Sequence, residues 1–400
     1  MSSTAPASAH QRIARLATLT AVHRAFHWLH LHQPQLRLWQ LEMLAIPAPP
    51  FGEAARAEWF LGRFEALGLA NVRLDGAGNA FAELKPEGEP GLPCILLSAH
   101  LDTVFPATTP CIPIEDGPRI LCPGACDNAA GLTALLAVAA ALRFANVTPP
   151  VPILFAANVG EEGEGDLRGM RHIFLHGAYR DRIAAAIALE GSGTPAVVTK
   201  ALGSRRFRIT VTGPGGHSWT DAGRPNPIFI LSRALAKLAE MKLSEEPRTT
   251  LNVGHISGGT SINSIPESAT ALIDLRSTDP RELHATESAM RKILGDIATI
   301  EIIGDRPAGA LPENSPLLHT IRAVDRHLAL HTEVRMGSTD ANLPLSLGVP
   351  AVAMGAGGTG GGIHTLNEWY DPTGRETALR RILLTLLDVV HQASGAVPTG

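Results

Sequence analysis

Short apolar runs alternate with amphipathic stretches along both ends of the chain. Runs at 94–98, 151–159, 183–189 and 349–354 are apolar at almost every position, which is typical of strands buried on both faces of a parallel sheet. Helices are expected over residues 53–67, 131–143, 315–330 and 375–393, and the N-terminal segment (roughly 10–45) is also expected to be helical. This alternation predicts an α/β fold with a mixed, mostly parallel sheet.

The middle of the chain has a different pattern. Polar and apolar residues alternate in 206–213, 249–259 and 269–278, as in strands with one face in water. Helices are expected at 228–241 and 280–298, and a last strand at 298–304. The resulting order, β-α-β-β-α-β, predicts a smaller α+β domain at 200–307, inserted into a catalytic domain formed by 1–199 and 308–400.

Residues that can bind metal ions follow the apolar runs. The carboxyl ends of parallel strands meet at one edge of a sheet, so these side chains are expected to lie together. Two imidazoles and several carboxylates at one edge predict a metal centre, with hydrolysis as its chemistry. The residues concerned are His100, Asp102, Asp127, Glu161, Glu162, Glu190 and His364.

Several of these residues also have a simpler interpretation. Asp127 precedes a predicted helix and is a suitable N-cap. Glu161 and Glu162 would often form a solvated acidic turn, and Glu190 beside a glycine could be a plain loop residue. The combination of four such positions after apolar runs with Asp127 just before a helix favours the metal centre.

Three other motifs point to different chemistry and are weaker. Residues 355–360 match G-x-G-x-x-G, but the sequence that follows cannot open the helix that a dinucleotide-binding fold needs. His172 and His176 are four residues apart, yet no glutamate follows the first histidine as in H-E-x-x-H. No G-x-S-x-G is present, so a serine hydrolase lacks its main signal.

Length and composition set broader limits. A chain of 400 residues is expected to form about two domains. The net charge of −4 and the absence of any Lys/Arg block argue against a nucleic-acid partner, and no apolar stretch is long enough to predict a membrane span. The N-terminus lacks the features of a signal peptide, and the few cysteines include no C-x-x-C pair, which favours a cytoplasmic protein.

Several segments together resemble the M20 metallopeptidases, a co-catalytic zinc group that includes bacterial glutamate carboxypeptidase, peptidase T and acetylornithine deacetylase. The segments are Ser98–Val104, Asp127 before a helix, Gly160–Gly163, Glu190-Gly191 and His364–Glu368. The resemblance runs from about Ile46 to the last helix. It implies a zinc-exopeptidase-like catalytic domain, with the inserted domain as a lid or dimerisation domain and the protein as a homodimer.

The resemblance also implies a role for each residue. Asp127 would bridge two divalent ions, most commonly zinc, with cobalt or manganese as alternatives. His100 and Glu190 would hold one ion, and Glu162 and His364 the other. Glu161 would be the general base, and Asp102 would orient His100. In the inserted domain, the residues expected to contact substrate are His217, Asn263 and Arg276.

Two positions depart from the commonest pattern of the family. Many members have Asp where Glu190 stands, and Asn128 occupies a position where another residue is often found. Neither change removes a metal ligand, but both leave the subfamily open.

The expected reaction is hydrolysis of an amide or peptide bond next to a free carboxylate, in a small peptide or an N-acyl amino acid. An exopeptidase and an N-acyl amino acid deacylase remain open at this point. Two alternatives from other classes are a non-catalytic dimeric binding protein and a nucleotide-dependent enzyme that uses the glycine loop at 355–360.

Overall fold

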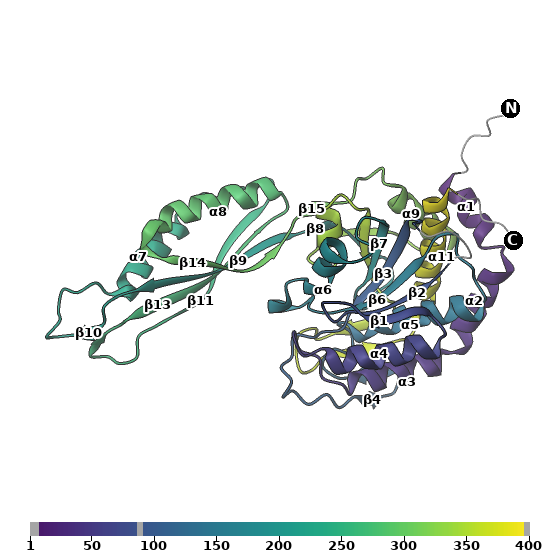
Figure 1. Ribbon diagram of the computed structural model, residues 1–400, viewed down its shortest axis with the longest axis horizontal. Coiled ribbons are helices and arrows are strands. Elements are labelled where there is room, and N and C mark those ends of the chain that lie inside the picture. Colours follow the sequence, from purple (N-terminus) through teal and green to yellow (C-terminus); the bar gives the residue numbers. More distant parts are fainter. Residues whose placement is uncertain (1–7, 86–90, 396–400) are drawn as a thin grey trace. The chain divides into compact units, whose positions relative to one another are not determined.

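The computed structural model, which describes residues 8–85 and 91–395, divides the chain into two compact units. Unit 1 contains both ends of the chain, Met1–Thr199 and Ala310–Gly400, and unit 2 is Lys200–Gly309. Figure 1 shows that each unit has a sheet and helices of its own.

Unit 1 is built on a nine-stranded mixed sheet in the order β1-β2-β6-β3-β7-β17-β8-β15, with β16 paired to β8. The central strands β6, β3, β7 and β17 are parallel, whereas β1, β2 and β8 pair antiparallel with their neighbours. The predicted α/β fold with a mixed sheet is therefore confirmed. The strands are β1 (Ala70–Leu74), β2 (Ala80–Leu84), β3 (Cys94–His100), β6 (Ile153–Asn158), β7 (Ile183–Leu189), β8 (Ala196–Ala201), β15 (Gly309–Ala310), β16 (Glu333–Gly337) and β17 (Ala351–Met354).

The helical N-terminus consists of three helices. Residues 17–19 separate the first two, and Pro34 lies in the first turn of the third, where its missing N–H costs nothing. The predicted helices at 53–67, 131–143, 315–330 and 375–393 are present with slightly shifted ends. The helices of unit 1 are α1 (Ala9–Leu16), α2 (Thr20–Leu31), α3 (Gln33–Leu44), α4 (Ala54–Ala66), α5 (Ala129–Phe144), α6 (Arg168–Arg171), α9 (Pro316–His327), α10 (Asn342–Ser346) and α11 (Arg375–Ser394).

The core of unit 1 lies around the parallel strands. Every residue of β3 and β6 is buried, as the continuous apolar runs predict for strands covered on both faces. Helices α5 and α11 pack against β3, and α4 packs against β1 and β2 (Figure 1). Helix α5 is buried along almost its whole length, which explains why its sequence is apolar on every side.

A second, four-stranded sheet of unit 1 has the order β18-β19-β5-β4 and joins two distant parts of the chain. These strands are β4 (Ile114–Asp116), β5 (Arg119–Leu121), β18 (Thr359–Gly361) and β19 (Trp369–Asp371). Strand β18 occupies part of the G-x-G-x-x-G segment, so no helix follows the motif and a dinucleotide site of that type is excluded. The turn between β18 and β19 carries His364.

Unit 2 has the order β9-α7-β11-β13-α8-β14 along the chain, and its sheet has the order β11-β13-β9-β14. Residues of β13 alternate between buried and partly exposed, and α7 and α8 cover the buried face (Figure 1). The elements are β9 (Gly203–Thr212), α7 (Pro227–Ala239), β11 (Thr249–Gly258), β13 (Ser268–Ser277), α8 (Pro280–Leu294) and β14 (Thr299–Arg306), with a two-stranded ribbon of β10 (Gly216–His217) and β12 (Ser264–Ile265).

The chain leaves and re-enters unit 1 through neighbouring strands. Strands β8 and β15 are adjacent in the nine-stranded sheet, and the Leu311 N–H donates to the Thr199 carbonyl oxygen at 2.8 Å. The chain therefore leaves unit 1 and returns to it at adjacent positions of the same sheet.

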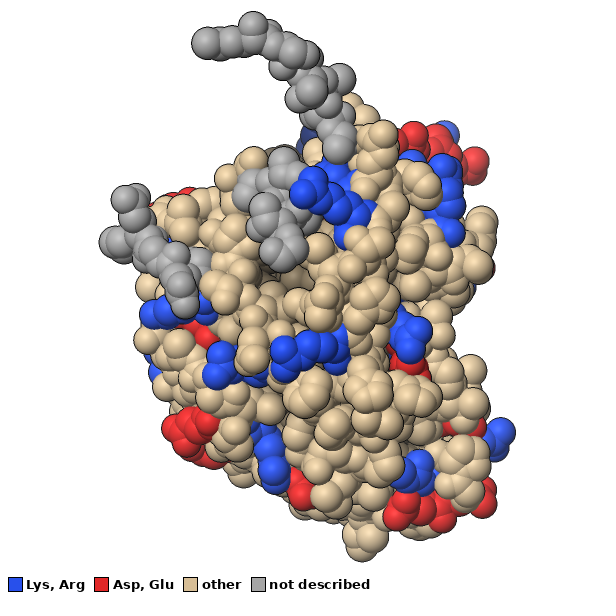
Figure 2. Space-filling view, turned by 90° about the vertical axis from the view of Figure 1, so that its right-hand side faces the viewer, with Lys and Arg blue, Asp and Glu red and all other residues tan. Residues whose placement is uncertain are grey.

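The helices and the charge distribution on one face of the described structure bear on membrane-spanning and nucleic-acid-binding function. Within residues 8–85 and 91–395, the helices are too short or too polar to cross a bilayer. On the face in Figure 2, lysine and arginine side chains form small groups separated by uncharged residues, with acidic residues among them.

Candidate metal centre

The expected ligands lie at the carboxyl ends of the parallel strands. His100 is the last residue of β3, and Glu190 directly follows β7. Glu161 and Glu162 follow β6, which pairs with β3 in parallel register, so their turn lies beside His100. Asp127 comes from the segment before α5. The sheet thus gathers residues that are far apart in the sequence.

Asp127 lies between the two histidines. Its Oδ1 is 3.1 Å from His100 Nε2, and its Oδ2 is 3.1 Å from His364 Nε2. His100 Nε2 is also 3.2 Å from Glu190 Oε1, and His364 Nε2 is 3.0 Å from Glu162 Oε1. Each oxygen of the central carboxylate therefore faces a different histidine–glutamate pair.

This donor set fits divalent metal ions. One ligand atom each from His100, Asp127 and Glu162 lies within 4.8 Å of the others, and imidazole nitrogen with carboxylate oxygen suits zinc, cobalt or manganese. Glu190 Oε2 is buried and has no hydrogen-bond partner among the described residues. Buried carboxylate oxygens of this kind are costly unless a cation is bound to them.

The two imidazoles are held in an acidic environment. Burial opposes a charged His100 ring, but the surrounding carboxylates, Glu190 foremost, raise its pKa well above the ordinary value. The hydrogen bond with Asp127 is the main reason why the pKa of His364 is raised to about 9. Protons thus occupy the places on these nitrogens that a metal ion would take.

The pKa values of the Glu162 and Asp127 carboxylates are shifted in opposite directions. Burial and the negative charge of Asp127 raise the pKa of Glu162 to about 7. Burial would also raise the pKa of Asp127, but its contacts with His100 and His364 hold that pKa well below the ordinary range. The site therefore concentrates negative charge on Asp127, the residue that faces both histidines.

Asp102 makes a contact that the sequence did not suggest. His100 Nδ1 is 3.0 Å from the main-chain carbonyl oxygen of Asp102, whereas the Asp102 carboxylate Oδ1 is 3.6 Å away. That carboxylate accepts the backbone N–H groups of Glu161 at 2.9 Å and Glu162 at 2.7 Å. Asp102 thus fixes the turn that carries the proposed base, while its main chain orients His100. Glu161 itself is 4% exposed.

Glu368 supports the Asp127 turn, a role that the sequence did not reveal. Its carboxylate accepts the backbone N–H groups of Gly124, Cys126 and Asp127, each at 2.8 Å. Glu368 is fully buried, and burial raises its pKa while these three donors lower it. In the sequence, only its position four residues after His364 indicated that Glu368 lies close to the site.

A second missed group lies beneath the site. Asp340 is 1% exposed, and its Oδ2 accepts from Asn158 Nδ2 at 2.8 Å. Asn158 is the β6 partner of His100 in the parallel register. Burial raises the pKa of Asp340 to about 7, against the effect of the nearby His100. From the sequence, the loop that carries Asp340 was expected only to connect two elements.

In unit 2, the structure brings His217 and Asn263 together. His217 lies in β10 and pairs with Ser264 of β12, and the Ser218 N–H donates to the Asn263 carbonyl oxygen at 3.0 Å. The His217 Nδ1 accepts backbone N–H groups from Trp219 and Thr220 at 3.2 and 3.3 Å. In the neutral ring the proton is therefore on Nε2, which is free to act as a donor.

Arg276 lies apart from that pair. It is near the far end of β13, eight residues beyond Ser268, which corresponds to about 26 Å along the strand. Its Nε donates to Asp274 Oδ2 at 2.6 Å. Within one chain, Arg276 and the His217–Asn263 pair therefore do not form a single cluster.

Known proteins are similar to this chain in sequence and fold. Residues 96–391 match peptidase family M20/M25/M40. A probable succinyl-diaminopimelate desuccinylase of Staphylococcus aureus (strain N315) is 24% identical over 350 residues, which cover 76% of this chain and 83% of that protein.

Two solved structures show the same fold. A tripeptidase from Staphylococcus aureus subsp. aureus Mu50 has a TM-score of 0.72 at 24% identity, covering 89% of this chain and 98% of that chain. The YXEP protein of Bacillus subtilis, a dinuclear metal-binding peptidase from the M20 family, has a TM-score of 0.66 at 17% identity. That match covers 90% of this chain and 98% of the other.

Proposed function

The chain belongs to peptidase family M20/M25/M40, and on this premise we propose that it hydrolyses an amide or peptide bond next to a free carboxylate in a metal-dependent reaction. The observation that carries the proposal is the placement of Asp127 between His100 and His364, with Glu161 on the adjacent turn. A binding protein without catalysis would not need a buried glutamate held at that position.

We expect two divalent ions, most commonly zinc. His100 and Glu190 would hold one, Glu162 and His364 would hold the other, and Asp127 would contact both. The paired contacts around the two oxygens of Asp127 support this division. When bound, such ions lower the pKa of a water molecule and polarise a carbonyl group.

Glu161 is proposed as the general base and acid. Its carboxylate takes a proton from the attacking water as the water oxygen adds to the carbonyl carbon. It then gives that proton to the leaving nitrogen as the C–N bond breaks, so the products are an amine and a carboxylic acid, whose remaining proton passes to the amine or to solvent at neutral pH. The Asp102 carboxylate fixes the backbone of Glu161 and thereby limits how far the base can move.

Residues of unit 2 are proposed to contact substrate. The Nε2–H of His217 is suited to donate to an oxygen on which negative charge develops, an interaction worth roughly 3 kcal/mol. Arg276 would bind the free carboxylate of the substrate, since its planar guanidinium can form two charge-assisted hydrogen bonds. Because Arg276 is distant from His217 and Asn263 along one chain, we propose that a homodimer supplies them from different copies.

A deacylase of the same family is the second candidate. The similarity to a probable succinyl-diaminopimelate desuccinylase favours it, because that reaction also cleaves an amide. Both reactions would use the same metal centre.

The free state of all four cysteines supports the cytoplasmic location expected from the sequence.

A substrate screen separates the two candidates. The protein, loaded with zinc, cobalt or manganese, is incubated with dipeptides and with N-acyl amino acids, and kcat/KM is measured for each. A preference for dipeptides supports the peptidase, and a preference for N-acyl amino acids supports the deacylase. Elemental analysis of the loaded protein should give two ions per chain. One ion or none would contradict the bridging role of Asp127.

The carboxylate contact is tested with Arg276→Lys, which keeps the charge but removes the planar donor. We expect kcat/KM to fall by about 2–3 kcal/mol in transition-state free energy for free-acid substrates. Substrates with an amidated carboxylate should be poor for the parent and lose little more in the variant. Equal cleavage of amidated and free-acid substrates by the parent would refute the contact.

A further inference from the structure

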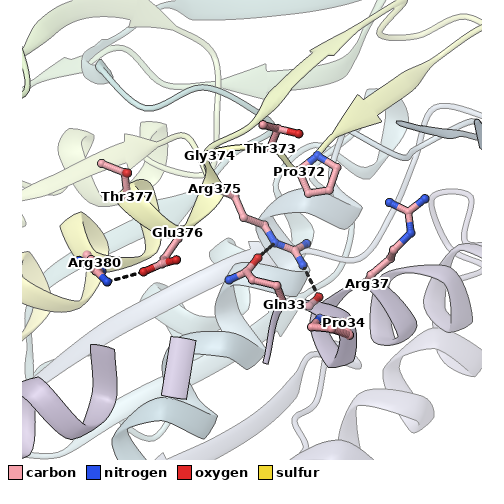
Figure 3. A pocket seen from close by; sticks show the side chains of 10 residues that line it. All are labelled: Gln33, Pro34, Arg37, Pro372, Thr373, Gly374, Arg375, Glu376, Thr377 and Arg380. Atoms are coloured by element: carbon pink, nitrogen blue, oxygen red, sulfur yellow. Dashed lines mark hydrogen bonds and ion pairs between the residues drawn. The ribbon is translucent and has the colours of Figure 1, made fainter. Parts of the chain in front are cut away.

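A cavity of about 640 Å³ lies in unit 1 where the starts of α3 and α11 meet. Figure 3 shows its lining, which comes from residues 33–37 and 372–380. The first turns of both helices contribute, and the amino-terminal end of a helix attracts negative charge. Neither segment contains a candidate metal ligand, catalytic residue or substrate-binding residue.

The lining carries excess positive charge. Arg37, Arg375 and Arg380 line the cavity, against a single acidic residue, Glu376. Glu376 already forms an ion pair with Arg380, and Arg37 is paired with the exposed Glu115 at 2.6 Å. Arg375 is different, because it has no carboxylate within ion-pair distance among the described residues.

Arg375 is a buried charge without a counter-ion. It is 3% exposed, and its guanidinium reaches from the start of α11 toward Gln33, donating to Gln33 Oε1 at 2.7 Å and to the Gln33 carbonyl oxygen at 2.9 Å (Figure 3). These acceptors are neutral amides. Burial lowers the pKa of Arg375, the nearby Tyr370 partly offsets this, and the like charge of Arg37 lowers the pKa further. A buried cation beside another cation is costly unless an anion lies nearby.

We propose that this cavity binds a small oxyanion, specifically the phosphate group of a small molecule, through Arg375 and Arg37. A phosphate has the charge that the lining lacks, and arginine forks bind its oxygens in pairs. The cavity volume lies within the usual range of about 300–1,000 Å³ for small-molecule sites, so there is room for more than the phosphate group itself.

Two connections lead from this cavity to the Asp127 turn. Arg375 donates to Gln40 Oε1 at 3.4 Å, and Gln40 Nε2 donates to the Ala125 carbonyl oxygen at 3.0 Å, two residues before Asp127. Along the chain, the lining residue Pro372 follows β19, and Glu368, which binds the Asp127 N–H, directly precedes that strand. An anion that orders Arg375 is therefore expected to stabilise the metal centre.

Binding is tested by titrating inorganic phosphate into the full-length, metal-loaded protein at constant ionic strength, with calorimetric detection. We expect saturable binding that Arg37→Gln weakens by about tenfold or more, the scale of a lost charge-assisted hydrogen bond. Arg322→Gln, an exposed arginine of α9, is the matched control and should bind like the parent. The Arg37 side chain is 21% exposed, whereas Arg375 is 3% exposed, so replacing Arg37 is less disruptive to folding than replacing Arg375.

Location and coupling are tested separately. Crystals soaked in tungstate, an oxyanion that scatters anomalously, should show a peak beside Arg375, and phosphate should slow the loss of metal to a chelator in the parent but not in Arg37→Gln. Absence of saturable binding, or equal binding by the parent and Arg37→Gln, would overturn the site. Metal loss that phosphate slows equally in both proteins would overturn the connection to Asp127.

Discussion

Asp127 places one carboxylate between two imidazoles, and this arrangement makes the metal-free protein sensitive to pH. The pKa of His364 is raised to about 9 and that of Glu162 to about 7, against ordinary values of about 6.5 and 4.5. A group whose pKa is raised on folding stabilises the folded state below its unfolded pKa, and this contribution is lost as the pH rises through the folded value.

We therefore expect the metal-free protein to lose stability as the pH rises through about 7 and then about 9. Apparent metal affinity should increase over the same range, because metal ions displace these protons. Urea denaturation of the metal-free protein and metal titrations across this range measure the two effects. A stability that increases with pH across this window would contradict the proton positions.

The second prediction concerns the proposed base. Glu161→Gln keeps the shape of the side chain but cannot accept a proton, so we expect kcat to fall by about 100-fold or more with metal content unchanged. The exposed Glu164 in the same turn provides the control, and Glu164→Gln should retain activity. Retention of more than about a tenth of the parental kcat by Glu161→Gln would refute the assignment.

Glu368 gives the third prediction, because it binds three backbone N–H groups of the Asp127 turn. Glu368→Gln removes the negative charge and one acceptor, so the turn should hold Asp127 less firmly. We expect metal affinity to fall about 10- to 100-fold, as for other residues that orient ligands. Competition with a chelating dye gives the affinity. An unchanged value would show that Asp127 is positioned without Glu368.

At the scale of elements, apolar patterning predicted the long strands and helices well. Runs such as 94–98 are buried on both faces, so their sequence alone contains the signal. The three-residue strands of the second sheet were missed, because they are short and because the pairing that joins its two halves, Leu121 with Trp369, spans more than two hundred residues. No local periodicity records such a pairing.

The same reasoning explains which site residues were found. Ligands at strand ends follow from the sheet, since parallel strands end at one edge. The roles of Glu368 and Asp340 depend on contacts with residues far away in the sequence. Their carboxylates look like ordinary loop residues until the chain is folded.

Helix α5 illustrates how an element is fixed at its start. Asn128 Oδ1 accepts from the Gly131 N–H at 3.1 Å and from the Gly191 N–H at 3.0 Å, and its Nδ2 donates to the Leu189 carbonyl oxygen at 2.9 Å. The helix is thereby attached to the end of β7. This explains why asparagine at the position after Asp127 is compatible with the site.

The fourth prediction follows from the close approach at Gly131. A Cβ there would lie 2.2 Å from Asn128 Oδ1 and 2.6 Å from the Leu189 carbonyl oxygen. We expect Gly131→Ala to destabilise the protein by about 1–3 kcal/mol in urea denaturation. Gly62 of α4 has nothing within 4 Å of such a Cβ, so Gly62→Ala should be neutral or stabilise by about 0.5–1 kcal/mol. Equal effects of the two changes would refute the argument.

At the scale of the whole molecule, the fifth prediction concerns the proposed dimer. Strand β11 is an edge of the unit 2 sheet, and its Ile256 is 55% exposed. An apolar edge of this kind is prone to pair with another chain. We expect a dimer by light scattering that Ile256→Lys converts to a monomer.

Strand β14, the opposite edge of the same sheet, provides the control. Ile302 of β14 is 47% exposed, and Ile302→Lys should leave the dimer intact. If only Ile302→Lys gave a monomer, the interface would involve β14 and the prediction for β11 would be wrong. A fully active monomeric parent would refute the dimer and with it the contribution of His217 from a second copy.

The junction between Thr199 and Leu311 has an evolutionary consequence. The inserted unit begins and ends at adjacent strands of one sheet, so the two points where the chain leaves and re-enters unit 1 lie side by side. A coding segment for unit 2 can therefore be gained, lost or exchanged at a single point in the gene without reordering the strands that carry the ligands. Substrate preference, if it resides in unit 2, can then diverge by recombination while the metal-binding residues stay unchanged.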